Sequence, residues 1–591
     1  MGKDYTFINP YNFIPVGENC NRTKSSTKTY TGYIECELET LTPLIMLDTA
    51  KFNEVNNHKI YNDTYKLNDV PAIPASQLRG MIRNKFETLT NSCMSSAEEE
   101  LPFYGRYNGN MRNAGLLDFT DPYNPKLYAC KAYNLNDDQY NEVKSYKIGD
   151  CIDFDIKEYY KNGKKKTSVV VDKYGEYKGY LKIGELFNKK HACHLFVKGD
   201  IVHADNSSDF IKMYKEISDT YKDNLDRHHD SYTTSLFKPV WYEKSGNYVY
   251  FSLGQNGQTK YRRRLKDVMY DEFLPCNDKN NLCEGCQLFG TVQGDLSVGG
   301  KVRFEDAYML DQYVNNYLDR KGLVLEELAG PKYNNAIFYM YFFDKDDNKV
   351  TDYTEWNWNV DFYSKFNPKK ITLNPIKDGY IEIRGRKEYW HHKPANQLNV
   401  EKTKRNITVD TVKSNVKYGF KVYFDNITQE QLEHLNMAIS LENDSSYAHK
   451  LGHGKPLGYG SVKIKTTHIV YRDVELKDGK FVYSMTKWIS DKNKLFDVFN
   501  KLTDIQMYAI EQMYDFNFLY NKNVIVDYPR NEKDGKIFEW FERNKKERQK
   551  AVLPFAEWEY DDLIQRGIDK KQKNTNRGNN SAFKGKSKSY K

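Results

Sequence analysis

The sequence predicts an α+β fold, because strand-like and helix-like patterns follow one another along most of the chain. Three segments carry this prediction. Residues 30–47 begin with alternating side chains typical of a strand, residues 75–89 repeat apolar side chains at helical spacing, and residues 418–466 combine both patterns. The mean hydropathy is -0.81, and no run of about 18 apolar residues is present. We therefore expect a soluble, cytoplasmic protein without a membrane partner.

The first strand is followed by a long polar loop, residues 48–69, and then by the predicted helix. Ser76 is predicted to cap the N-terminus of this helix. Arg79 and Arg83 lie four residues apart on one helix face, beside Gly80. Arginines at this spacing either keep a helix face soluble or hold phosphate groups, and the pattern leaves both interpretations open.

Residues 121–235 are rich in strand and turn patterns and predict a β-rich insertion. Three consecutive arginines follow it, and their clustered charge makes them candidates for RNA binding: Arg262, Arg263 and Arg264.

A cluster of three cysteines comes next, formed by Cys276, Cys283 and Cys286. The chain has nine cysteines, too few for a disulfide-stapled fold, so the cluster predicts a metal site in a reducing compartment. A structural zinc needs four ligands. We expect the fourth to be a distant histidine, and His228 and His229 are the nearest upstream. Buried cysteines without a metal are the alternative.

A short segment further along combines basic, aromatic and titratable side chains. Aromatic rings stack on bases and cations hold phosphates, so four residues suit single-stranded RNA: Arg386, Lys387, Tyr389 and Trp390. His391 and His392 are candidates for acid–base cleavage of RNA at the 2′-OH. Adjacent residues on a strand point to opposite sides, which argues against both acting on one phosphate.

Residues 418–466 predict a strand, a helix, a loop and a second strand, which is half of a ferredoxin-like βαββαβ unit. Thr428 and Gln431 fit a capping box at the start of the helix.

The loop of this unit is rich in glycine, which allows a positive φ and a close approach to a polyanion. Its glycines are Gly452, Gly454, Gly458 and Gly460. Lys450 and Lys455 add positive charge to the same turn, and His453 adds hydrogen-bond donors. A structural connection would also explain the glycines, but the surrounding strand and helix patterns favour contact with RNA.

The formal net charge of +8 lies entirely in residues 570–591, which contain eight basic and no acidic residues. The rest of the chain is formally neutral, so a folded body that binds RNA has to use local patches. Residues after about 475 read as helical, and residues 566–591 are charged and poor in apolar side chains, which predicts disorder.

Four motifs together resemble the RAMP superfamily of CRISPR-associated RNA-binding proteins. They are the helix start Pro74–Arg83, the cysteine segment Cys283–Gly290 with the strand Lys301–Ala307, the segment Gly385–His392, and the loop Lys450–Ile464. The resemblance implies ferredoxin-like (RRM-like) domains and a role similar to that of the backbone-type subunits of type III effectors. It implies guide RNA and other effector subunits as partners, antiviral defence as the process, and a structural zinc. It also implies phosphate contacts at the Ser76 helix and at the glycine loop.

In type III backbone subunits an Asp in the loop after the first strand supports metal-dependent cleavage of target RNA. Asp48 is the best candidate here, although alignment from the Ser76 helix places the family position near His58 and Lys59. Mg²⁺ or another divalent metal is expected only if the chain cleaves RNA.

We divide the chain into five parts, and either two fused RAMP units or one heavily inserted unit fits the pattern. The parts are an N-terminal extension (1–29), a first RAMP-like domain with the β-rich insertion (30–235), a second with the cysteines and glycine loop (236–470), a helical region (471–565) and a basic tail (566–591). Three functions follow as alternatives. The chain is a scaffold that holds guide RNA, alone or together with target RNA, or an endoribonuclease that cleaves guide precursor or target RNA, or a non-catalytic assembly factor of a ribonucleoprotein complex.

Overall fold

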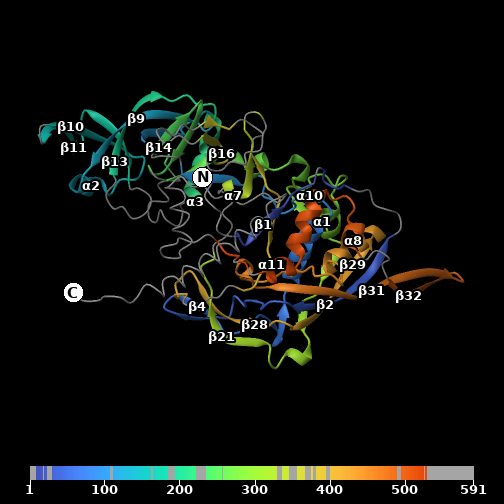
Figure 1. Cartoon of the computed structure of the whole chain (residues 1–591). Helices are drawn as coiled ribbons and strands as arrows, with labels where there is room; N and C mark the ends of the chain where they lie inside the picture. The colour runs from blue at the N-terminus through green and yellow to red at the C-terminus, as the bar shows by residue number, and fades with distance from the viewer. Residues whose placement is uncertain are drawn as a thin grey trace, which may run out of the picture. The chain divides into compact units, whose positions relative to one another are not determined.

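The computed structural model of the chain contains two compact units (Figure 1). Unit 1 consists of Met1–Glu99, Met269–Asn357 and Ile381–Lys591, and unit 2 of Glu100–Val268 and Trp358–Tyr380. The residues that the structure describes are 8–17, 19–22, 29–106, 111–161, 164–183, 193–220, 235–255, 257–328, 336–344, 346, 356–365, 374–376, 381–394, 400–488, 494–522, 524 and 526–528.

The centre of unit 1 is an antiparallel sheet. Its middle strands are, in spatial order, β31 (Ser461–Lys477), β2 (Tyr30–Thr40), β29 (Lys417–Ile427), and then β19 (Val302–Phe304) with β20 (Ala307–Met309). Ile34 of β2 lies opposite Val422 on one side and Ile469 on the other. Alternate residues of β2 are buried, as expected for a strand with one apolar face. The sheet therefore draws strands from both of the predicted RAMP-like domains.

Two helices cover the apolar face of this sheet and lie side by side (Figure 1): α1 (Ala75–Leu89) and α8 (Gln429–Ser440). Leu78, Ile82 and Phe86 of α1 join the strand residues in one hydrophobic core, together with Leu435 of α8. The capping box of α8 is confirmed, because the Thr428 side chain accepts the N–H of Gln431 and the Gln431 side chain accepts the N–H of Thr428.

The predicted cap of α1 is wrong. The helix begins at Ala75, and Pro74 occupies the N-cap position without a side-chain hydrogen bond. The carboxylate of Asp306 accepts the Ala75 N–H over 2.7 Å, so a residue more than 200 positions away replaces Ser76 in this role. Ser76 is exposed in the first turn.

The predicted helical region also needs a correction. Residues 461–488 form a hairpin of β31 and β32 (Lys480–Trp488), turned by Asp478 and Gly479 with φ values of 50° and 72°. Two positive φ values in a two-residue loop are the signature of a hairpin turn, and Asp-Gly is a preferred sequence for it. Within the described residues that follow the hairpin, the helices are α9 (Leu495–Val498), α10 (Asp504–Tyr514) and α11 (Asn517–Tyr520).

Smaller elements complete unit 1. The N-terminal strand β1 (Tyr11–Ile14) pairs with β27 (Arg386–Tyr389), which ties the N-terminal extension to the basic and aromatic segment. The remaining elements are β3 (Asn53–Val55), β4 (His58–Tyr61), β5 (Lys66–Leu67), β6 (Val70–Ile73), α6 (Glu284–Phe289), β17 (Thr291–Gln293), β18 (Leu296–Val298), β21 (Leu318–Val324), α7 (Ala336–Tyr339), β22 (Met340–Phe342), β26 (Ile381–Ile383), β28 (Ile407–Val412) and β30 (His449–Lys450).

Unit 2 is built on an eight-stranded sheet with the order β11-β10-β12-β13-β9-β8-β14-β15. The strands of the sheet are β8 (Asn113–Asp118), β9 (Lys126–Leu135), β10 (Cys151–Lys161), β11 (Lys164–Val171), β12 (Tyr177–Lys182), β13 (Cys193–Ile201), β14 (Phe237–Ser245) and β15 (Tyr248–Ser252). The other elements are β7 (Pro102–Arg106), α2 (Asp137–Val143), α3 (Phe210–Thr220), β16 (Gln258–Arg264), β24 (Phe362–Lys365) and β25 (Asn374–Pro375), while β23 (Trp356–Trp358) lies at the boundary.

The two units bear out the α+β class, with mostly β content. The predicted insertion at residues 121–235 lies inside unit 2, whose first segment, Glu100–Val268, extends beyond the insertion at both ends. The helices that the structure describes are all too short or too polar to cross a membrane. The predicted basic tail, residues 566–591, lies outside the described residues.

Candidate functional site

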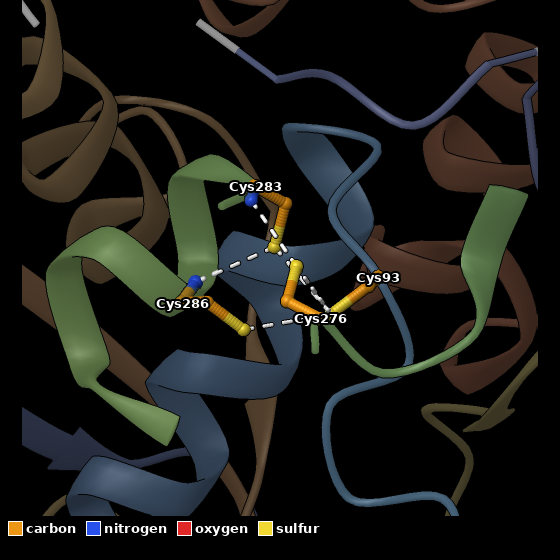
Figure 2. A group of neighbouring side chains, drawn as sticks. All are labelled: Cys93, Cys276, Cys283 and Cys286. Carbon is orange, nitrogen blue, oxygen red and sulfur yellow. Dashed lines mark hydrogen bonds between the residues drawn. The ribbon is translucent and has the colours of Figure 1, made fainter. Parts of the chain in front are cut away.

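Four cysteines of unit 1 gather in one buried cluster: Cys93, Cys276, Cys283 and Cys286 (Figure 2). Their sulfur atoms all lie within 4.8 Å of one another, and the Sγ of Cys93 is 3.4 Å from that of Cys283, 3.5 Å from that of Cys286 and 3.7 Å from that of Cys276. Figure 2 shows the four sulfurs turned toward a common centre.

This geometry fits a tetrahedral zinc. Zinc–sulfur bonds of 2.3 Å place neighbouring sulfurs about 3.8 Å apart, close to the separations in the cluster. Four thiolates close the coordination sphere, so the site would be structural and would leave no position for water or substrate. The backbone N–H of Cys283 donates to the Cys276 sulfur and that of Cys286 to the Cys283 sulfur, which stabilises thiolate charge.

The predicted metal residues are therefore brought together, but the fourth thiol is Cys93, just after α1, and not a histidine. His228 and His229 lie outside the described residues. Local spacing could not identify Cys93, because 183 residues separate it from Cys276.

Two further residues border the cluster from the N-terminal extension. Cys20 is buried beside it, and its hydrogen bond is the main cause that lowers the pKa of Cys283. The Arg22 guanidinium lies 3.2 Å from the Cys276 sulfur and donates to the Asn281 carbonyl over 2.7 Å. A four-thiolate zinc carries two net negative charges, and Arg22 is placed to offset one of them.

The cluster links several elements of unit 1. Glu284 of α6 pairs with His434 of α8 over 2.6 Å, and the Gly285 N–H donates to the Ser92 hydroxyl over 2.9 Å. Arg386 of β27 donates to the carbonyls of Ser92 and Cys93. A metal here would hold the end of α1 against α6 and β27, and its loss would loosen all three.

The glycine loop follows β30 and precedes β31. Its four glycines all have positive φ: 78° at Gly452, 73° at Gly454, 90° at Gly458 and 72° at Gly460. A Cβ at Gly452 would lie 2.5 Å from the Ile45 carbonyl, a Cβ at Gly458 2.7 Å from the Lys393 carbonyl, and a Cβ at Gly460 would overlap the Leu451 carbonyl. Backbone conformation and close packing within the chain thus account for these glycines.

The three polar side-chain candidates of the loop have different environments. Lys450 is buried, its Nζ donates to the Tyr459 carbonyl over 3.2 Å, and burial lowers its pKa to about 7. His453 is exposed, and Lys455 is half-buried. The backbone N–H groups of Gly452 and Gly454 donate no hydrogen bond within the described part of the chain. Of the three side chains, those of His453 and Lys455 reach solvent.

The two histidine candidates are buried in unit 1. His391 contacts the Ser461 hydroxyl through Nδ1 over 2.9 Å and the Ala448 carbonyl through Nε2 over 3.2 Å. His392 contacts the Lys393 carbonyl through Nδ1 over 2.9 Å. Burial lowers the pKa of His391 well below its usual value and that of His392 to about 3, so both rings are neutral at pH 7.

The other residues of this segment are engaged within unit 1. The Arg386 guanidinium reaches Glu87 over 3.5 Å. The Lys387 Nζ lies 3.8 Å from the Tyr11 ring centre, and burial lowers its pKa to about 8. Trp390 is buried and stacks on Phe518 with ring centres 5.8 Å apart. Three members of the segment remain partly exposed: Arg386, Lys387 and Tyr389.

The helix α1 presents a polar stripe. Ser76, Gly80 and Asn84 are exposed and lie four residues apart, so they share one face. The two arginines lie beside this stripe and are half-buried: Arg79 donates to the Phe289 carbonyl, and Arg83 binds Glu87 over 2.7 Å.

In unit 2 the three arginine candidates support the fold. Arg263 is buried, donates to the Val360 carbonyl over 2.7 Å and lies 4.0 Å from Asp361. Arg264 binds Glu216 over 3.1 Å, and Arg262 donates to the Ile376 carbonyl over 3.4 Å. Asp48 is half-buried in unit 1, where its carboxylate accepts the Ala50 N–H over 3.2 Å and lies 3.6 Å from the Lys51 Nζ.

A protein-family model, described as the RAMP superfamily, matches residues 37–262 and 267–463. No curated protein matches the chain significantly. The matched segments cover more than two thirds of the sequence and include α1, the cysteine cluster and the glycine loop. The chain therefore belongs to the RAMP superfamily, which is associated with the RNA-binding complexes of CRISPR systems.

Proposed function

We propose that this chain is an RNA-holding subunit of a type III CRISPR ribonucleoprotein, and that guide RNA runs over the start of α1 and the exposed part of the glycine loop. Its central strands, with β2 between β31 and β29 and two helices on one face, support a ferredoxin-like unit interrupted by large insertions.

The helix stripe and the loop both approach β27, the stripe at Glu388 and the loop at Tyr389. The Asn84 side chain donates to Glu388 over 2.9 Å, and the buried Lys85 pairs with the same carboxylate over 3.0 Å. From the loop side, the Lys455 Nζ lies 5.8 Å from the centre of the Tyr389 ring. The exposed parts of α1 and of the loop thus both lie next to β27, which supports one RNA path over the two segments.

Gly80 is the observation that carries the proposal. It lies inside a 15-residue helix, where glycine costs roughly 0.5–1 kcal/mol relative to alanine. A Cβ at this position would meet nothing within 4 Å in the described part of the chain. The protein's own packing therefore gives no reason for the glycine, whereas close passage of an RNA backbone would.

We favour a scaffold over a nuclease. Both ring nitrogens of His391 are occupied by protein groups, and its burial keeps it away from solvent. A ring in this position has no free nitrogen for proton transfer to RNA.

Asp48 defines the second candidate, cleavage of target RNA with a divalent metal. Asp48 is half-buried and lies three residues after Ile45, whose carbonyl accepts the His453 N–H over 2.9 Å. Asp48 therefore belongs to a segment that contacts the glycine loop. Incubation of wild type and Asp48→Ala with labelled target RNA and Mg²⁺ separates the two roles. Absence of cleavage by both proteins supports the scaffold, and cleavage that Asp48→Ala abolishes supports the nuclease. Equal cleavage by both proteins would refute Asp48 as the metal-binding residue and would contradict the scaffold.

Fluorescence anisotropy with a mixed-sequence single-stranded RNA tests the binding surface. Lys455→Ala should weaken binding and reduce the slope of log affinity against log salt by about 0.7, the value for one phosphate contact on a single strand. Lys321→Ala is the matched control, because this exposed lysine of β21 pairs only with Asp319 among the described residues. Equal affinities and slopes for the two variants would refute the loop as an RNA contact.

A further inference from the structure

The hairpin of β31 and β32 carries an unusual surface that the RNA-binding role does not use. Beyond Tyr471 it runs as a two-stranded ribbon away from the rest of unit 1 (Figure 1). Its strands pair with each other as far as Lys477 and Lys480, and β2 no longer accompanies them. We call residues 472–487 the arm.

One face of the arm is apolar. Strand register places Val474 opposite Tyr483 and Leu476 opposite Phe481, with Met485 next on the same face. All five side chains are exposed, from 47% at Val474 to 68% at Phe481. Together they offer about 500 Å² of apolar surface, the size of the largest patch on many soluble proteins and often a functional one.

The cations of this face lie at the base of the arm. Arg472 lies opposite Met485, and Lys487 lies opposite Val470, so both belong to the apolar face. Neither forms an ion pair with another described residue. The acids of the arm that belong to the paired strands, Asp473 and Glu475, lie on the other face.

The composition of the arm disfavours RNA as its ligand. The arm contains four basic and three acidic residues, so it has almost no net field for phosphates. Val474 and Leu476, which are the apolar residues that β31 contributes to this face, have no ring to stack on a base.

A second copy of the chain is also disfavoured. Two arms that met through this face would bring four cations and no acid into one contact, and like charges at an interface suppress association.

We propose that the arm docks a different protein, one that presents an apolar surface bordered by carboxylates. The five apolar side chains would be buried in the contact, and Arg472 and Lys487 would pair with the acids at its edge. The arm alone is smaller than the roughly 800 Å² that each partner contributes to a standard interface, so the partner would also contact neighbouring surface. This inference goes beyond RNA binding and does not depend on it.

Co-purification tests the proposal. The full chain is tagged, co-expressed with the proteins encoded by neighbouring genes, and purified. The amounts of each co-purified protein and of RNA are then measured relative to the amount of the tagged chain. Leu476→Ser with Phe481→Ser should reduce one protein at least tenfold and leave the RNA unchanged. Val482→Ser is the matched control, because Val482 is an exposed apolar residue on the opposite face. Reversal of the charges, with Arg472→Glu and Lys487→Glu, should reduce the same protein.

A photo-crosslinking amino acid in place of Tyr483 identifies the occupant in the otherwise unchanged complex. We expect a crosslink to that same protein, in a peptide with apolar residues and at least one Asp or Glu. A crosslink to RNA, to a second copy or to another segment of this chain would overturn the proposal. Unchanged protein content in the double serine variant would overturn it as well.

Discussion

Gly80 allows the RNA surface to be tested with a substitution that should stabilise the protein. In Gly80→Ala the new methyl group meets no atom within 4 Å beyond the backbone of its own helix in the described structure, and the helix interior gains the propensity difference between glycine and alanine. We expect the free energy of unfolding to rise by about 0.5–1 kcal/mol. For a unit of this size that corresponds to an increase in Tm of about 1 °C.

The same substitution should weaken RNA binding. A methyl group forced into a close backbone contact costs about 1–3 kcal/mol, so we expect roughly a tenfold loss of affinity. Gly80→Gln extends the series, because glutamine is also a good helix former but is larger. Its Tm should rise like that of Gly80→Ala, and its affinity should fall further.

Thermal unfolding and anisotropy on the same preparations separate stability from binding. Both variants should be more stable than wild type and bind RNA less tightly. If both raise Tm and bind RNA as wild type does, nothing passes close to Gly80 and the proposed path is wrong. If Tm falls, the helix position is not open as described.

Three other changes test the remaining parts of the account. Cys93→Ser should reduce zinc, measured by elemental mass spectrometry, from about one per chain to near zero and lower Tm by about 5 °C or more, whereas substitution of the exposed Cys151 of unit 2 by serine should retain zinc. Buried His392 should lower the free energy of unfolding by about 1 kcal/mol between pH 6.5 and 5.5. The reason is that the ring takes up a proton in the unfolded chain but not in the folded one, where its pKa is lowered to about 3. In denaturant titrations, His392→Asn should make the free energy of unfolding depend less on pH over this range. Arg263→Ala should destabilise unit 2 by about 3 kcal/mol in the same titrations, because Asp361 stays buried without the Arg263 cation. If the folded variant binds RNA less tightly than wild type, Arg263 contacts RNA and its purely structural role is wrong.

Local patterns identified the elements that are set by neighbouring residues. The capping box at Thr428, the alternation in β2 and the apolar stripe of α1 all depend on side chains within one or two turns, and all three are present. The turn at Asp478 and Gly479 had the same kind of signal, and the helical interpretation missed it.

Long-range pairing could not be predicted in this way. Asp306 caps α1 and Cys93 completes the metal cluster, and neither has a local pattern that indicates its partner. Clustered charge was also misleading, since Arg263 is neutralised within unit 2 by a residue about 100 positions away. A basic residue indicates RNA only when it is exposed, and the sequence does not report exposure.

Crosslinking of RNA to the purified chain by ultraviolet light, followed by mass spectrometry of the peptides, tests the central claim most directly. We predict nucleotide-bearing peptides from the start of α1, around Ser76–Asn84, and from the loop around His453 and Lys455. Crosslinks that avoid both segments, or a chain that binds no RNA at low salt, would contradict the proposed function.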